Sequence, residues 1–274
     1  MKLNFKTKGI IHILLIAGSL IMIAPFAWML LTSVKTFGEA SAIPPIIIPK
    51  HFKWANYAKT FEMLPFAQFY INTIITTVAK TVGQLVFCSM AAYAFARIKF
   101  PGRDVLFIIL LSVLMVPGQL FIIPNFKTIQ ALGLLNSLSA IIIPGLFSAY
   151  GVFLLRQFFL TLPMELEEAA VIEGCNHFQI FWKIMLPLAR PGLISLSIFT
   201  ILWSWNDFLW PLIVNTSLEK LTLSVGIASL QGQYLTDYPI LMAGAVMCIW
   251  PMVVMFMIFQ KSFIEGIAIT GSKS

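Results

Sequence analysis

Six long apolar stretches limit what this chain can fold into more than any other feature. They are approximately Ile10–Val34, Ile71–Ala96, Val105–Pro124, Ser137–Phe158, Gly192–Val214 and Ile240–Phe263. An α-helix rises about 1.5 Å per residue, so about 20 apolar residues cover the hydrocarbon core of a bilayer. The stretches therefore predict an all-α, polytopic membrane protein with six transmembrane helices.

The overall composition points to the same class. Hydrophobic residues make up 59% of the 274 positions and charged residues 11%, whereas soluble domains carry roughly 45–50% and 25%. No polar block is long enough to form a soluble domain, so we predict a single transmembrane domain over residues 1–274. The first stretch is longer than the roughly 7–15-residue apolar core of a secretory signal, which indicates a retained span.

The Lys and Arg residues indicate how the helices are oriented. If both termini are cytoplasmic, eleven of the 18 basic residues lie inside, six lie outside and Lys80 falls within the second span. Cytoplasmic loops of membrane proteins carry such an excess, so we predict that the termini and the loop of residues 161–190 are cytoplasmic. The basic residues are scattered along the chain, and the net charge of +7 therefore does not indicate a nucleic-acid partner.

The loop of residues 161–190 carries the signals of two short helices. In the first, Glu165, Glu167 and Glu168 favour the positive N-terminus of a helix, and Pro163 suits its first turn. Gly174 can adopt the left-handed conformation that ends a helix. These residues predict a short helix followed by a sharp turn.

The second helix of the loop begins at an expected capping box. Asn176 supplies the capping oxygen, Gln179 follows three residues later, and Pro187 is expected to stop the helix. Its apolar stripe, with helical spacing, consists of Phe178, Phe181, Trp182 and Met185. On the first helix, the small Ala169 and Ala170 allow another backbone to approach. The pattern fits docking into the groove of a partner protein, but also folding back onto the spans or onto lipid headgroups.

Polar residues at membrane depth mark a second region. Asn206 and Asp207 fall in the fifth span, among Trp203, Trp205 and Trp210. An ionisable residue there should face a cavity or an opposite charge, which predicts a translocation path. Carboxylate and amide groups bond to sugar hydroxyls, and aromatic rings pack against sugar faces. Alternatively, Asp207 braces the helix bundle and the tryptophans form an interfacial belt.

Two further features of the spans bear on such a path. Lys80 lies at a depth similar to that of Asp207, so the two could form an ion pair, or Lys80 could extend toward the outer surface. Pro117 and Gly118 break the third span next to Gln119, which we include among the path residues. Such breaks are tolerated where protein or a water-filled cavity satisfies the backbone, although a simple kink is the alternative.

The spacing of the loop residues resembles a known family motif. The motif positions are Glu168, Ala169, Ala170, Gly174, Ile184, Leu186 and Pro187. They resemble the EAA loop of ABC-transporter importer permeases. The stretches "LMVPGQLFIIPNF", "ALGLLNS", "LRQFFLTLPMELEEAA", "SWNDFLWPLIV" and "FIEGIAITGSKS" are similar to the carbohydrate-importer branch, the maltose-permease type.

This resemblance implies a permease subunit that imports a sugar or oligosaccharide by alternating access. Its partners would be a second permease, two cytoplasmic ATPase subunits and an extracytoplasmic solute-binding protein, in the lipid of a bacterial cytoplasmic membrane. The loop, with Phe178 and the motif residues, would be a coupling helix seated in the ATPase, between spans four and five. The chain has no phosphate-binding loop, so ATP and Mg would be used by the partners and no cofactor by this chain.

Other functions remain as alternatives. A permease for another polar solute, such as a phosphorylated polyol, fits the same features. An intramembrane enzyme would need paired catalytic groups, yet the chain has no His-x-x-x-His and no G-x-S-x-G. A scaffold that only anchors an ATPase gives no reason for Asp207. The three cysteines are dispersed, which argues against a disulfide framework or a metal site.

Overall fold

The computed structural model describes the backbone of residues 5–231 and 236–271 and the side chains of residues 9–231 and 236–260. Helices are the only regular secondary structure in this part of the chain. The chain divides into two compact units, of which the first holds Met1–Phe66 and Gly226–Pro251 and the second Ala67–Val225 and Met252–Ser274.

The first unit is organised around a short helix. Its helices are α1 (Phe5–Ser33), α2 (Phe37–Ala40), α3 (Ala55–Met63) and the first part of α15 (Tyr238–Gly271). In α3, the Asn56 side chain donates to the backbone oxygens of Ser33 and Lys35 at 2.8 and 2.9 Å. The Thr60 hydroxyl donates to the backbone oxygen of Ile240 at 3.3 Å. These bonds attach α3 to the end of α1 and to α15.

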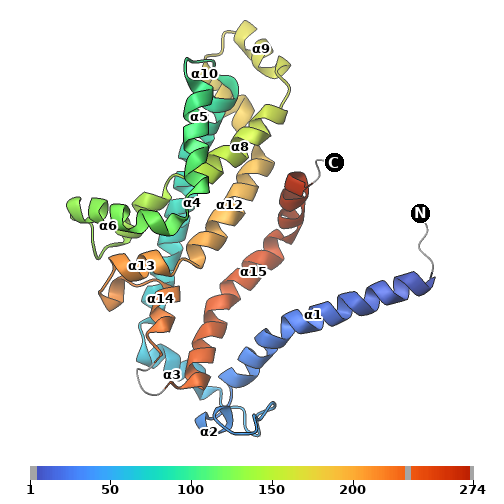
Figure 1. The fold of residues 1–274 in the computed structure, drawn as a ribbon, viewed down its shortest axis with the longest axis vertical. Coiled ribbons are helices and arrows are strands. Elements are labelled where there is room, and N and C mark those ends of the chain that lie inside the picture. Colours follow the sequence, from blue (N-terminus) through green and yellow to red (C-terminus); the bar gives the residue numbers. More distant parts are fainter. Residues whose placement is uncertain (1–4, 232–235, 272–274) are drawn as a thin grey trace. The chain divides into compact units, whose positions relative to one another are not determined.

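The second unit contains most of the helices. They are α4 (Phe66–Arg97), α5 (Arg103–Ser112), η1 (Val113–Met115), η2 (Gly118–Phe121), α6 (Ile122–Ala131), α7 (Leu138–Ile142), η3 (Ile143–Gly145), α8 (Ala149–Thr161), α9 (Glu165–Ile172), α10 (His177–Ile180), the π-helix η4 (Phe181–Met185), α11 (Leu186–Leu188), α12 (Arg190–Trp205), α13 (Leu209–Val214), η5 (Leu218–Lys220) and α14 (Leu223–Ala228). Helices α4, α8 and α12 pack together around fully buried side chains such as Cys88, Leu155 and Leu196 (Figure 1).

Glycines allow the helices of the second unit to approach closely. A Cβ atom added at Gly83 of α4 would stand 3.3 Å from the Cα atom of Leu146, and one added at Gly151 of α8 would stand 3.0 Å from the Cys88 sulfur. Distances of 3.0–3.4 Å are tighter than nine in ten real Cβ contacts, so a larger residue at either position would require its neighbours to shift.

Four helical segments are long and apolar enough to cross a membrane. They are Gly9–Ser33, Phe66–Arg97, Leu138–Thr161 and Tyr238–Gln260. Two further candidates are sharply bent pairs, Arg103–Met115 with Gly118–Ala131 at 101°, and His177–Leu188 with Arg190–Trp205 at 75°. The described residues therefore hold four to six candidate spans, and the predicted six require each bent pair to count as one.

The third predicted span, Val105–Pro124, is broken in its middle, as Pro117 and Gly118 predicted. The helix ends at Met115, and Val116 is extended with φ −94° and ψ 127°. Pro117 causes this break, because its ring disfavours helical geometry in the preceding residue. The chain then turns into η2 and α6.

The prediction of a fifth span over Gly192–Val214 is wrong in its second half. Helix α12 ends at Trp205, so Asn206 and Asp207 lie in a break before α13 rather than within a helix. Short polar side chains compete for backbone hydrogen bonds and favour such helix ends.

The loop of residues 161–190 follows most of its predicted local structure. Gly174 has the left-handed φ of +84° after α9, and Asn176 and Gln179 form the capping box that starts α10. Two details differ. Pro163 precedes α9 rather than lying in its first turn, and Pro187 does not stop the second helix but lies within α11. The π-helix η4 just before Pro187 is the kind of local adjustment that accommodates a proline.

Candidate functional site

One face of α4 carries a stripe of buried polar side chains, which we call the polar stripe. It consists of Asn72, Thr73, Thr76, Thr77, Lys80, Thr81 and Gln84. Their spacing of about four residues places them on one side of the helix. In a largely apolar unit, each buried polar group needs a hydrogen-bonding partner.

The N-terminal residues of the polar stripe, Asn72 and Thr73, form hydrogen bonds to the segment that follows α13. The Asn72 side chain donates to the backbone oxygens of Glu219 and Leu221, both at 2.8 Å. The Thr73 hydroxyl accepts a hydrogen bond of 2.8 Å from the backbone N–H of Leu223. These bonds fix the segment between α13 and α14, which contains η5, against α4.

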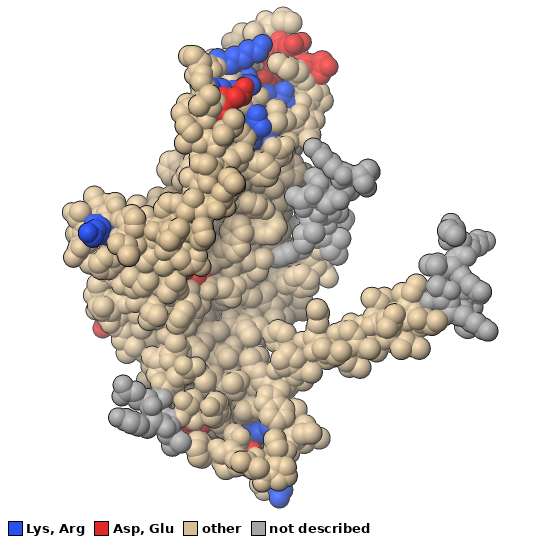
Figure 2. All heavy atoms as spheres, in the orientation of Figure 1, with Lys and Arg blue, Asp and Glu red and all other residues tan. Residues whose placement is uncertain are grey.

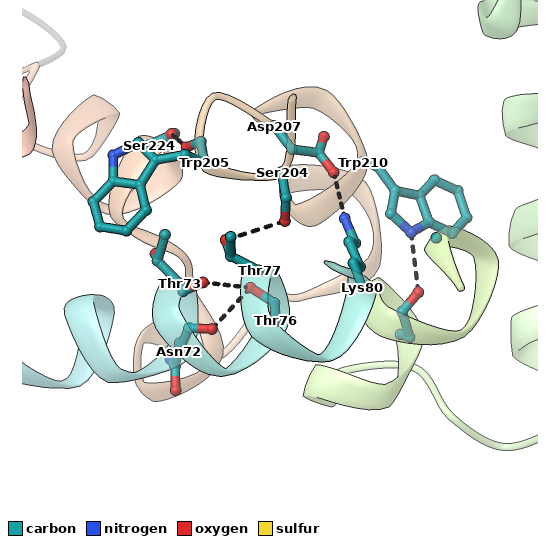
Figure 3. A network of polar contacts seen from close by, with 12 residues as sticks. Asn72, Thr73, Thr76, Thr77, Lys80, Ser204, Trp205, Asp207, Trp210 and Ser224 are labelled. Carbon is teal, nitrogen blue, oxygen red and sulfur yellow. Dashed lines mark hydrogen bonds and ion pairs between the residues drawn. The ribbon is translucent and has the colours of Figure 1, made fainter. Parts of the chain in front are cut away.

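The second half of the polar stripe brings two charges together. The ammonium of Lys80 lies 3.0 Å from Oδ2 of Asp207 (Figure 3). Its aliphatic stem runs past Gly145, where an added Cβ would stand 2.8 Å from the stem carbons. One turn earlier, the Thr77 hydroxyl donates to the Ser204 hydroxyl at 3.2 Å. Lys80 therefore pairs with Asp207 across α4 and the end of α12.

Gln84 completes the polar stripe. It accepts a hydrogen bond of 2.8 Å from the Thr200 hydroxyl and donates one of 2.9 Å to the backbone oxygen of Gly145. A cavity of about 290 Å³ opens beside these groups, lined by Lys80, Gln84, Gly145, Thr200, Trp203, Ser204 and Asp207. The Trp203 ring packs edge-on against Tyr150, with ring centroids 5.2 Å apart, while half of the tryptophan stays exposed.

Only some of the predicted path residues meet at this cavity. Lys80, Asp207 and Trp203 line it. Asn206 is exposed, and its side chain donates to the backbone oxygen of Leu202.

The remaining predicted path residues have other positions. Trp210 donates its indole N–H to the backbone oxygen of Ala140 at 3.0 Å and packs in a core between α6, α7 and α13. Trp205 is half-buried and does not line the cavity, and Gln119 is exposed on η2. The structure thus gives Trp210 a bracing role.

Four lining residues, Gln84, Gly145, Thr200 and Ser204, were not among the predicted path residues. A signal for Gln84 exists in the sequence, because polar residues recur every fourth position through the apolar second stretch, from Asn72 to Gln84. Among the described residues, no group of three or more His, Cys, Asp and Glu side chains could hold a metal ion.

Helices α9 to α11 and the turn at Gly174, which we call the elbow, have one buried face. Ala170, Ile180, Phe181 and Met185 are each at most 4% exposed and join the core formed with α4 and α8. Phe181 and Met185, half of the predicted stripe, therefore fold back onto this chain.

The opposite face of the elbow is apolar and exposed. Phe178 and Trp182 are 67% and 57% exposed, and their rings stack with centroids 6.5 Å apart. Val171 and Ile172 of α9 are also exposed. Soluble surfaces rarely leave such side chains together without a binding partner.

The motif residues divide between the two faces of the elbow. Glu168, Ala169, Gly174 and Pro187 are exposed. Ile184 and Leu186 are partly buried and pack against the core. Charged side chains gather around this end of the second unit, whereas the surface over α8 and α12 is almost free of charge on the face drawn in Figure 2.

Arg97, the last residue of α4, connects that helix to the elbow. Its guanidinium donates to the backbone oxygens of Phe159 and Leu162 at the end of α8. Its Nε lies 3.4 Å from a carboxylate oxygen of Glu167 in α9, close enough for an ion pair but without hydrogen-bond geometry. Burial raises the pKa of Glu167, and the charges of Arg97 and His177 partly oppose that rise.

Residues 84–268 match the family described as binding-protein-dependent transport system inner membrane component. The match covers two thirds of the chain, including the end of the polar stripe, the elbow and the break at Asp207.

Three relatives match along most of their own lengths. The chain is 37% identical to the arabinooligosaccharides transport system permease protein AraQ of Halalkalibacterium halodurans, over 98% of this chain and 99% of the relative. It is 35% identical to the diacetylchitobiose uptake system permease protein NgcG of Streptomyces coelicolor, over 93% and 86%. It is 31% identical to the sn-glycerol-3-phosphate transport system permease protein UgpE of Yersinia pestis, over 93% and 94%.

A solved structure shares the fold. It is described as a bacterial ABC transporter involved in the import of the acidic polysaccharide alginate, and one of its chains superposes with a TM-score of 0.84 at 24% identity, over 95% of this chain and 99% of that chain. The family resemblance inferred from the sequence is therefore confirmed. The chain belongs to the binding-protein-dependent transport system inner membrane components and is a non-catalytic permease subunit.

Proposed function

We propose that this permease moves a sugar or oligosaccharide across a bacterial cytoplasmic membrane by alternating access, past the cavity at Lys80 and Asp207. The observation that carries the proposal is the charged pair beside an open cavity in an otherwise apolar helix bundle. Charges at membrane depth are costly and are retained mainly where they pair or line a solute pathway.

Sugars are the solute class that fits the cavity chemistry best. The lining offers hydroxyl, amide, ammonium and carboxylate groups together with the exposed ring of Trp203. Such a set matches a solute with hydroxyl groups on its edges and apolar faces. Two of the three relatives are named for oligosaccharide or disaccharide uptake, which supports the same class.

A phosphorylated polyol is the second candidate. One relative is named for sn-glycerol-3-phosphate transport, and Lys80 supplies a cation in the cavity. The pairing of Lys80 with Asp207 speaks against this candidate, because the carboxylate neutralises the charge that a phosphate would need.

We further propose that the elbow is a coupling helix that seats its exposed face in a cytoplasmic ATPase subunit. The exposed rings of Phe178 and Trp182 form an anchor of the kind that fills a partner's groove. The excess of Lys and Arg on the same side supports cytoplasmic termini and a cytoplasmic elbow, which follows the fourth and precedes the fifth predicted span.

The full assembly would contain four kinds of partner. They are a second permease subunit, two ATPase subunits that use ATP and Mg, an extracytoplasmic solute-binding protein, and membrane lipid. Residues 1–274 would act as one permease domain that binds no cofactor.

Uptake by the reconstituted complex tests the solute class. The complex, with its ATPase subunits and binding protein, is placed in proteoliposomes and supplied with radiolabelled arabino-oligosaccharides or sn-glycerol 3-phosphate. We expect ATP-dependent accumulation of the oligosaccharide only. Accumulation of the phosphate ester alone would favour the second candidate, and a complex that hydrolyses ATP without moving either class would contradict both.

A paired substitution tests the elbow. Trp182→Ser should leave the permease inserted but reduce ATPase co-purification at least about tenfold, since anchors of this type contribute 2 kcal/mol or more to binding. Trp250→Ser is the matched control, because Trp250 of α15 is similarly exposed but lies outside the elbow. Equal co-purification of both variants with wild type would exclude the elbow as the ATPase contact.

A further inference from the structure

Charge at the cavity is confined to a single ion pair. Of its seven lining residues, only Lys80 and Asp207 are ionisable, and their charges are opposite. The cavity is therefore polar but carries no net charge.

We propose that the Lys80–Asp207 pair is a charge-balanced selectivity element, which admits neutral, hydroxyl-rich solutes and disfavours anionic solutes of the same shape. This inference rests on the proposed function. It adds which feature of the path discriminates between neutral and anionic solutes.

The geometry keeps the two charges together. The Lys80 side chain is only 9% exposed, and its stem is confined by Gly145 on one side. The ammonium cannot swing far without leaving this contact, so Oδ2 of Asp207 stays its partner at 3.0 Å. Asp207, whose side chain is 25% exposed, is the more accessible member of the pair.

The neutral lining groups are already bonded to one another. Gln84 uses its oxygen for Thr200 and its nitrogen for the backbone of Gly145, and Ser204 accepts from Thr77. An entering solute therefore finds its strongest unused hydrogen-bonding capacity at the ion pair, where the second carboxylate oxygen of Asp207 has no partner among the described residues.

The two charge classes meet this pair differently. A sugar hydroxyl both donates and accepts, so it can donate to the carboxylate and accept from the ammonium without breaking the pair. A phosphate or carboxylate would approach Asp207 as a like charge, and the attraction of Lys80 for it is already cancelled. The anion would thus lose its hydration without gaining a net opposite charge.

Size and aromatic lining set no preference between the classes. The cavity of about 290 Å³ lies at the lower end of small-molecule pockets, roughly 300–1,000 Å³, and has room for about one sugar unit. The Trp203 ring offers the same apolar face to neutral and acidic sugars. Any discrimination by charge should therefore depend on the net charge at this position, which the pair keeps at zero.

D-Glucose and D-glucuronate are matched probes, because they differ only in a hydroxymethyl group versus a carboxylate. The full-length permease, with the subunits that co-purify with it, is placed in lipid nanodiscs at pH 7. The Kd of each probe is measured by saturation-transfer difference NMR for wild type, Asp207→Asn, Lys80→Gln, the double variant and Trp203→Ala. The readout is the Kd of glucuronate divided by that of glucose.

Wild type should give a ratio of about 10 or more, because an uncompensated charge costs at least 1.4 kcal/mol here. Asp207→Asn exposes the Lys80 charge and should lower the ratio at least about tenfold. Lys80→Gln should raise it at least about threefold, and the double variant should return to within about threefold of wild type. Trp203→Ala should weaken both probes and leave the ratio unchanged.

An unchanged ratio in Asp207→Asn and Lys80→Gln would overturn the inference. If one single variant does not assemble, the other two variants still test the inference. The remaining single variant must shift the ratio in its expected direction, and the double variant must restore it. Binding of neither probe to wild type, in a complex that still accumulates oligosaccharide, would refute this selectivity element while leaving the importer function intact. If the wild-type complex showed no ATP-driven uptake of any sugar, the proposed function itself would be refuted.

Discussion

The polar stripe of α4 and the exposed face of the elbow are opposite exceptions to the usual distribution of residues. Along the polar stripe, a lysine, a glutamine and several threonines are buried in the second unit. On the elbow, beside most of the charged residues of that unit, two large aromatic rings are exposed. Buried polar groups and exposed apolar patches are the informative departures in any protein.

The difference shows how the surroundings decide what a residue must do. Where side chains are buried or half-buried in the helix packing, the polar groups pair with each other, as Lys80 does with Asp207 and Gln84 with Thr200. On the exposed face of the elbow, no part of this chain that the structure describes covers the apolar rings, so they need a partner protein. The polar stripe is therefore complete within this chain, whereas the elbow is not.

The largest expected effect is a loss of stability when the ion pair of the polar stripe is broken. It should appear in the isolated permease, because the polar stripe, unlike the elbow, needs no partner protein. Lys80→Met and Asp207→Leu should each destabilise the isolated permease by about 2–4 kcal/mol, because each leaves one buried charge unpaired. The double variant should be less destabilised than the sum, by about 1–3 kcal/mol. Chemical unfolding in detergent, with solute uptake alongside, measures both. Strictly additive losses would mean that the pair contributes nothing as a pair.

The second prediction concerns the turn of the elbow. Gly174→Val should strain the left-handed backbone by about 1–2 kcal/mol and abolish coupling between ATP hydrolysis and uptake. Gly102→Val is its matched control, because Gly102 also has positive φ, at +80°, and both sites have open space around the missing Cβ. Both variants should lose similar stability, but only Gly174→Val should lose uptake. Uncoupling by both variants would assign the effect to general strain.

A smaller effect is expected at Glu168. Its side chain is exposed in the first turn of α9, and an exposed charge contact is usually worth under about 1 kcal/mol. Glu168→Gln should therefore reduce ATPase affinity by less than about fivefold and leave the stability of the permease unchanged. Titration of the ATPase subunit against permease nanodiscs measures the affinity. A loss as large as that of Trp182→Ser would make the contact electrostatic rather than apolar.

The smallest expected effect is a pH dependence at the junction of the two regions. Burial raises the pKa of Glu167 above that of the unfolded chain, so the folded state binds more protons between those two pKa values. The stability of wild type relative to Glu167→Gln should be highest below the ordinary carboxyl pKa, and should fall as the pH rises through the raised pKa. Unfolding of both proteins between pH 4 and 7 measures this slope. A difference that grows with pH would contradict the burial of Glu167.

Local signals in the sequence predicted local structure well. The left-handed turn at Gly174 and the capping box of Asn176 with Gln179 were predicted and are confirmed, because both depend on residues within one helical turn. The predictions for Pro187 and for the fifth span were wrong. The chain around Pro187 absorbs the proline after a π-helical turn, and helix α12 ends at Trp205, after which Asp207 forms an ion pair with Lys80 of α4.

The predicted stripe of the elbow shows why periodicity alone does not identify a binding face. Its four residues have the same apolar character and helical spacing, yet Phe181 and Met185 are buried and Phe178 and Trp182 are exposed. The choice depends on where α4 and α8 approach the elbow. In the same way, nothing near Trp210 in the sequence indicates that its indole bonds to Ala140.

By itself, the sequence determined the membrane class, the helical fold, the family and the presence of charges at membrane depth. These follow from hydropathy, from spacing along one chain and from motif residues, all of which are local quantities. Only the tertiary structure decided that Lys80 meets Asp207 rather than the surface, that Gln84, Thr200 and Ser204 join them, and which face of the elbow stays exposed. Such pairings join residues more than 100 positions apart, and helix packing, which no local pattern encodes, brings them together.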